Sequence, residues 1–331
     1  MRSIRLACRM AAVVLAISAL ASCESGSPQT DPPRLATTPR PSTDGTIKSP
    51  LNEYFPSAEG EATMAEATDV LARRCLRRYG FRIEYPVVTG GVVSELRELD
   101  ESLFIPEKQA RKHGFSRLPE KPGKTTAKKH RRSGHLNREE VIDMLTVLNG
   151  TPPLDGRAKD KPASPTAVER FEGKNLPRHG CRGEASEKLS AGMRLPVRGQ
   201  SPGGELDAVN YVQGLRRQAS ERLEDDHRVK KVTEQWKRCF KEKTGLSYPN
   251  PYAAARDPKW IEDDKASSEE ISAAVAHTRC QLRLNYLGVV ESLMAAYEKR
   301  AETQNKTDLQ SVDRFFDARI KRSERMVRQA N

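Results

Sequence analysis

The stretch that decides the fold runs from Trp236 to Cys280 and begins WKRCFKEKTGLSYPNPYAAARDPKW (236–260). An acidic turn follows, and SSEEISAAVAHTRC (267–280) completes it. This pattern predicts two helices that are joined by a Pro-rich connection and carry one cysteine each. The stretch holds both tryptophans of the chain and two of its six cysteines. We interpret this stretch as a structural element that holds the fold together.

Apolar residues recur at helical spacing on both sides of this stretch, with capping residues at several ends. Helices are predicted from about Ala58 to Gly80, Asn137 to Gly150, Glu184 onward, Gly204 to Glu224, Asp226 to Gly245, Ser267 through Tyr297 and Thr307 to Val327. Alternating apolar and polar residues from Phe81 to Val88 indicate a short strand. The sequence therefore predicts a mainly α fold, an irregular helical bundle of about five to seven helices with long loops, two disulfides and at most a small β element.

The composition indicates a lean core and anionic surroundings. Only 36% of the 331 residues are hydrophobic, whereas 31% are charged. The formal charge is +12, and it falls to +9 when Arg2, Arg5 and Arg9 are removed with a signal peptide. Nucleic acid, anionic lipid head groups and anionic cell-wall polymers all suit a basic protein. The export signal described next favours the last two.

The N-terminus has the features of a bacterial export signal. Three arginines precede the apolar run from Met10 to Leu20, which is too short to span a bilayer. The run ends in Leu-Ala-Ser-Cys at 20–23, which resembles the lipobox of bacterial lipoproteins. This resemblance implies removal of residues 1–22, acylation of Cys23 and attachment to the extracytoplasmic face of the cell membrane. An ordinary secretory signal, in which Cys23 has no special role, is the alternative.

A segment rich in Pro, Ser and Thr follows the signal. Residues 23–56 contain six prolines before Leu51 and few large apolar side chains, so we expect a disordered tether. We expect a mostly α-helical extracytoplasmic domain at 57–331.

The cysteines predict two disulfides. Four cysteines remain after signal cleavage and acylation, and four cysteines allow three pairings. We predict the pairs Cys239–Cys280 and Cys75–Cys181. The first pair follows from antiparallel packing, because the helix of Cys239 ends soon afterwards at Gly245 and a connection of some twenty residues can fold back. In the second pair, a cysteine on the apolar face of the first helix meets one in a Gly-flanked turn.

A basic loop is expected near residues 106–136. Most of the run KPGKTTAKKHRRSGHLNR, from Lys121 to Arg138, lies in this loop. The run is either a contact for anionic lipid or cell-wall polymer or a solvated surface loop. No aromatic residue is interleaved to stack on bases, so we expect no nucleic-acid partner. The residues that such a contact would use are Lys121, Lys124, Lys128, Lys129, Arg131 and Arg132.

Signatures of common enzyme classes are missing from the sequence. It contains no H-E-x-x-H, G-x-S-x-G or S-x-x-K motif. His277 and His179 lie near cysteines, but exported cysteines without a C-x-x-C pair are more typical of disulfides than of a metal site. The group from Asp257 to Trp260 is either a sugar platform or a turn with an aromatic plug. A carboxylate pair of glycosidase type stays open. We expect no cofactor, no metal and no catalytic residue.

Five motifs in the chain resemble a family of uncharacterised actinomycete lipoproteins. They are CLRRYGF at 75–81, GCRGEA at 180–185, the segments Trp236–Gly245 and Asp257–Trp260, and Cys280. The resemblance implies export, lipid anchoring and disulfides, and it supplies no catalytic residue. We therefore expect a non-enzymatic binding or structural protein of the cell envelope. The alternatives are a cell-wall polymer hydrolase and a solute-binding lipoprotein.

Overall fold

The structure is a computed structural model, which describes residues 31–35, 37–40, 49–88, 104–115, 136–153, 166–193, 195, 204–260 and 265–330. The chain divides into two compact units, Met1–Pro32 and Pro33–Asn331. All helices and strands described below belong to the second unit.

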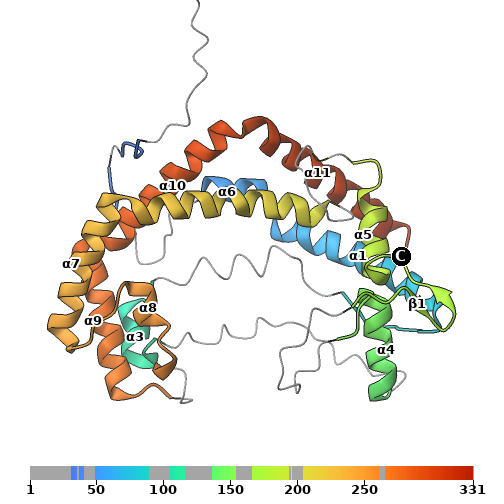
Figure 1. Cartoon of the computed structure of the whole chain (residues 1–331), viewed down its shortest axis with the longest axis horizontal. Coiled ribbons are helices and arrows are strands. Elements are labelled where there is room, and N and C mark those ends of the chain that lie inside the picture. Colours follow the sequence, from blue (N-terminus) through green and yellow to red (C-terminus); the bar gives the residue numbers. More distant parts are fainter. Residues whose placement is uncertain are drawn as a thin grey trace, which may run out of the picture. The chain divides into compact units, whose positions relative to one another are not determined.

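Among the described residues the fold is mainly α with one small sheet (Figure 1). The α-helices are α1 (Ala58–Arg78), α3 (Glu107–His113), α4 (Arg138–Asn149), α5 (Gly180–Ser190), α6 (Glu205–Asp225), α7 (His227–Thr244), α8 (Pro251–Ala255), α9 (Ser268–Leu284), α10 (Tyr286–Gln304) and α11 (Lys306–Arg328). Two 3₁₀ turns, η1 (Pro50–Tyr54) and η3 (Pro258–Trp260), and an antiparallel pair, β1 (Arg170–Phe171) and β2 (Lys174–Asn175), complete the described elements. The predicted fold class, with two disulfides and at most a small β element, is confirmed.

The ten α-helices in the described part of the chain exceed the expected five to seven. Two of them, α3 and α8, are short and lie in segments that were predicted to be loops from the sequence. A third arises because the helix expected from Ser267 through Tyr297 is broken at Asn285. That residue has φ of +51°, a left-handed conformation that asparagine tolerates better than most residues, and it divides α9 from α10.

The strand expected from Phe81 to Val88 does not form. The buried carboxylate of Asp69, on α1, accepts hydrogen bonds from the backbone N–H groups of Val87 and Val88 at 2.7 and 3.1 Å. These donors would otherwise be available to a neighbouring strand. A side chain on α1 therefore satisfies the segment in place of a β partner.

The predicted starts of α4, α7 and α9, which rest on capping residues, are confirmed, whereas Thr307 does not cap α11, which begins at Lys306 after Asn305. Asn137 and Glu140 form a reciprocal capping box at the start of α4. Asp226 accepts from the Arg228 N–H at the start of α7, and Gly245 ends that helix in the left-handed region. Ser267 caps α9 through the Glu270 N–H. Short polar side chains thus set these ends locally.

The helices pack in groups, each around its own apolar cluster. α1 packs against α5 and α11, α6 against α10, and α7 against α9, which also contacts α3 (Figure 1). Trp236, Phe240 and Trp260 belong to the cluster beneath α7 and α9. Leu51, Met64 and neighbouring apolar residues of α6 and α11 form a second cluster. The core is thus divided into several small clusters, as expected for a sequence with few apolar residues.

No helix in the described part of the chain is both long enough and apolar enough to cross a membrane.

Candidate functional site

The disulfide between Cys239 and Cys280 joins α7 to α9, as predicted. The two Cα atoms lie 5.9 Å apart, and both cysteines are buried. The indole of Trp236 stacks on Phe240 with ring centroids 4.9 Å apart, and His277 meets that indole edge-on at 5.6 Å. The bond is therefore embedded in the aromatic core of the helix pair, which indicates a structural disulfide.

The disulfide between Cys75 and Cys181 joins α1 to α5, also as predicted, with Cα atoms 5.5 Å apart. Cys181 lies in the first turn of α5, because that helix begins at Gly180 and not near Glu184. Gly180 has φ of +64°, and a Cβ there would lie 2.4 Å from the Gly150 nitrogen and 2.6 Å from the Leu148 carbonyl oxygen. The glycine thus allows the end of α4 to approach the start of α5.

Other predicted site residues lie outside the described residues. They are the lipidation residue Cys23 and the six basic residues Lys121, Lys124, Lys128, Lys129, Arg131 and Arg132. The basic loop expected near 106–136 begins with the helix α3, which packs on α9. The Glu270 carboxylate accepts from the Phe115 N–H at 2.9 Å and fixes the end of this helical segment.

Trp260 is an aromatic plug and not an exposed sugar platform. The side chain is buried, its Nε1–H donates to the Ala254 carbonyl at 2.8 Å, and its ring stacks on Phe115 at 5.5 Å. The Lys259 ammonium covers the indole at 4.0 Å from its centroid. No indole face is left for a ligand to stack on.

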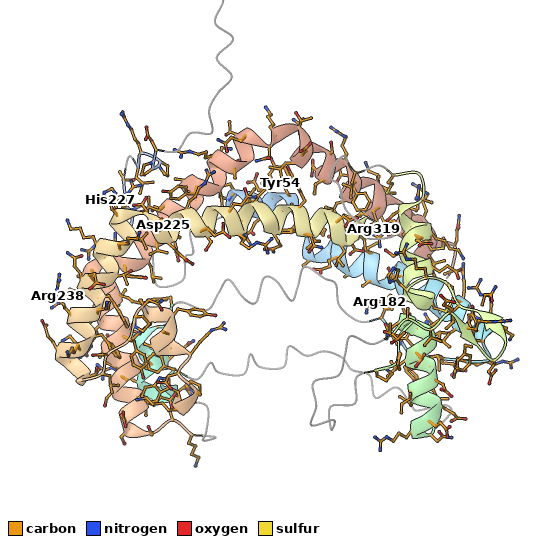
Figure 2. The ribbon with its side chains drawn as sticks, viewed as in Figure 1. Tyr54, Arg182, Asp225, His227, Arg238 and Arg319 are labelled. Atoms are coloured by element: carbon orange, nitrogen blue, oxygen red, sulfur yellow. A yellow bond between two sulfur atoms is a disulfide. The ribbon has the colours of Figure 1, made fainter. Side chains whose placement is uncertain are left out.

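The folded body begins earlier than residue 57, because part of the expected tether packs on it. Leu51 is fully buried, and the Ser49 hydroxyl donates to the buried carboxylate of Glu298 on α10. The Tyr54 hydroxyl, labelled in Figure 2, donates to Glu302 at 3.2 Å. This boundary was not predicted from the sequence, because the prolines of residues 23–56 indicated a disordered tether.

A second part of the expected tether, residues 33–35 and 37–40, is here called the N-terminal strap. Arg228 Nη1 donates to the Pro33 carbonyl at 3.0 Å, and Asn285 Nδ2 donates to the Thr38 carbonyl at 3.1 Å. Leu35 packs against the cluster of α6 and α10 that contains Tyr297. Proline lacks an N–H but keeps its carbonyl, so side chains of the body hold the strap through its acceptors.

Gly288 on α10 makes room for the strap. A Cβ at this position would lie 2.1 Å from the Pro39 carbonyl oxygen, which is far closer than two such atoms can approach. Because alanine has a higher helix propensity than glycine, Gly288→Ala should leave α10 intact and displace the strap. We expect faster tryptic cleavage after Arg34 in this variant, measured by limited proteolysis and mass spectrometry, because a displaced strap is more accessible to a protease.

Gly214→Ala on α6 is the matched control, since the nearest atom to its added Cβ lies 3.9 Å away. Unchanged cleavage after Arg34 in Gly288→Ala would show that the strap is not bound at Pro39.

Arg319 is a fully buried charge on α11, labelled in Figure 2. Its guanidinium donates to Glu205 Oε2 at 2.6 Å, to the Ser186 carbonyl at 3.1 Å and to the Ser190 hydroxyl. Burial lowers the pKa of Arg319 from its usual range, while Glu205 opposes that shift. The arginine therefore joins α11 to α5 and α6 and has a structural role.

Within the described ranges, no cluster of three or more His, Cys, Asp or Glu residues is arranged to hold a metal ion. The chain matches no protein-family model, no curated protein and no solved structure.

The Asp226 carboxylate binds Arg228, which in turn binds the strap at Pro33. Its pKa leads us to expect that the stability of the fold depends on pH. Two hydrogen bonds from the Arg228 guanidinium, at 2.6 and 2.9 Å, lower the pKa of Asp226 to about 2, and burial opposes this shift. Tyr297 donates a further bond at 3.0 Å. The pKa of Asp226 is lower in the folded chain than in the unfolded chain, where it is about 4. The ionised carboxylate therefore stabilises the fold above about pH 4, and this stabilisation is lost as the pH falls towards about 2.

Asp226→Asn keeps a good N-cap but removes the charge. We expect the free energy of unfolding of the unmodified chain to fall by about 2 kcal/mol more than that of Asp226→Asn between pH 5 and pH 2. Urea unfolding at several pH values measures this. Equal losses in both proteins would contradict the assignment.

Proposed function

We propose that this chain is a bacterial lipoprotein, anchored by an acylated Cys23 to the extracytoplasmic face of the cell membrane, with a non-enzymatic binding or structural role in the envelope. The observation that carries the proposal is the pair of buried disulfides. Structural disulfides form and persist outside the reducing cytosol. Together with a signal that ends in Leu-Ala-Ser-Cys, they support export and attachment.

Four buried carboxylates among the described residues support a non-enzymatic role, because they hold the fold. Glycosidases need two carboxyl groups that face a substrate across a few ångströms. Here buried carboxylates accept bonds from backbone N–H groups or arginines, in the pairs Asp69 with Val88, Asp226 with Arg228, Glu270 with Phe115 and Glu298 with Arg216. These contacts leave them unsuited to acid–base work on a polymer.

The anchoring is tested by Cys23→Ala. Two acyl chains on one residue give stable attachment, so removing the acceptor thiol should release the protein from membranes or leave an uncleaved precursor. Fractionation of cells and medium with immunoblotting measures this. Cys8→Ala is the matched control, because that cysteine lies within the removed signal and its loss should leave the protein anchored. A Cys23→Ala protein that stays on the membrane with its signal removed would exclude the lipid anchor.

A further inference from the structure

The outward side of α7 carries a row of basic residues. We call it the α7 basic face and define it as His227, Lys231, Arg238 and Lys241. Steps of three, four and seven residues place them on one side of the helix. The opposite side holds Trp236 and Cys239, which are buried against α9. Figure 2 labels His227 and Arg238 on this helix.

α7 as a whole is strongly basic, although Glu234 and Glu242 lie on the same side as the α7 basic face. α7 contains seven Lys or Arg residues and two Glu residues, a net charge of +5 apart from His227. Lys231, Arg238 and Lys241 are exposed, and none of them forms an ion pair with another described residue. Neighbouring Lys230 and Lys237 are paired with acidic residues. Three cations therefore remain available to an external anion.

The strap brings the start of the folded body to this helix. Pro33 is held by Arg228, which is next to His227 at the beginning of α7. Pro33 is the tenth residue after Cys23, and ten residue steps span at most about 36 Å in any conformation. α7 itself has 18 residues and is about 27 Å long. An anchor at Cys23 therefore limits how far Pro33, and the start of α7 that holds it, can lie from the bilayer.

We propose that the α7 basic face is a membrane-contact surface that binds anionic lipid head groups. The proposal rests on the proposed function, because the anchor at Cys23 supplies the proximity. Each Lys or Arg near an anionic leaflet strengthens binding about fivefold. The short connection favours a lipid surface over a wall polymer, because it limits the distance of the start of α7 from the bilayer and sets no limit to the wall.

The test uses the chain from residue 23 onward with Cys23→Ala, purified with its disulfides formed. This protein carries no acyl group, so vesicle binding does not depend on lipidation, and the variants below separate the α7 basic face from other basic segments such as the Lys121–Arg138 run. It is sedimented with vesicles of phosphatidylcholine alone and with 30% phosphatidylglycerol. We expect binding to the anionic vesicles that weakens with salt, because exposed charges are screened over about 8 Å at physiological ionic strength.

The variant Lys231→Gln, Arg238→Gln, Lys241→Gln should bind the anionic vesicles at least tenfold more weakly. The matched control removes three exposed charges elsewhere, as Arg77→Gln, Lys321→Gln, Arg325→Gln on α1 and α11, and should change binding less than twofold. Circular dichroism confirms that both variants are folded. An equal loss in both variants would assign binding to net charge and overturn the proposal. So would no binding to anionic vesicles, or α7-dependent binding to anionic wall polymer alone.

Discussion

A chain with Cys75→Ala and Cys181→Ala is expected to lose about 4 kcal/mol of its free energy of unfolding. The bond closes a loop of 106 residues between α1 and α5, and a cross-link across a long loop removes much conformational freedom from the unfolded chain. The loss should be large relative to the total stability, since domains are stable by only about 5–15 kcal/mol. Chemical denaturation followed by far-ultraviolet circular dichroism measures it.

Reduction provides the control for this prediction. Dithiothreitol should destabilise the unmodified chain by more than the double alanine variant, because the variant keeps only Cys239–Cys280. If reduction leaves the unfolding midpoint of the unmodified chain unchanged, the disulfides do not contribute to its stability.

Arg319→Met is expected to cost about 3–5 kcal/mol, because removing one partner of a buried ion pair leaves the other group without its counter-charge. The substitution removes the bonds from Arg319 to Glu205 and to the Ser186 carbonyl. Urea unfolding measures the change. A second variant that adds Glu205→Gln should recover part of the loss, since it removes the remaining charge.

Arg314→Met on the same helix is the control, because Arg314 is exposed and should change stability by less than about 0.5 kcal/mol. If Arg319→Met were equally mild, Arg319 would not join α11 to α5 and α6.

The sequence predicted the features that depend on local chemistry. The ends of α4 and α7 follow from Asn137, Asp226 and Gly245, whose side chains or backbone freedom act within one turn. Both disulfide pairings were also predicted, since apolar periodicity and the lengths of the connections limit which cysteines can meet. The mainly α fold follows from the same periodicity.

The features that the sequence did not reveal depend on distant partners. Asn285 lies in an apolar stripe that continues through the helix break, so periodicity alone cannot locate it. Arg319 looks like any other charge of α11 until Glu205 and Ser186, more than 100 residues away, are placed beside it. The strap has the composition of a tether, and only Arg228 and Gly288 on the body show where it binds.

The lipid anchor at Cys23 is tested most directly by mass spectrometry of the N-terminal peptide from protein extracted from membranes. We predict that the mature chain begins at Cys23 and that this residue carries a thioether-linked diacylglycerol. A mature N-terminus at another residue, or an unmodified Cys23 in the membrane fraction, would contradict it.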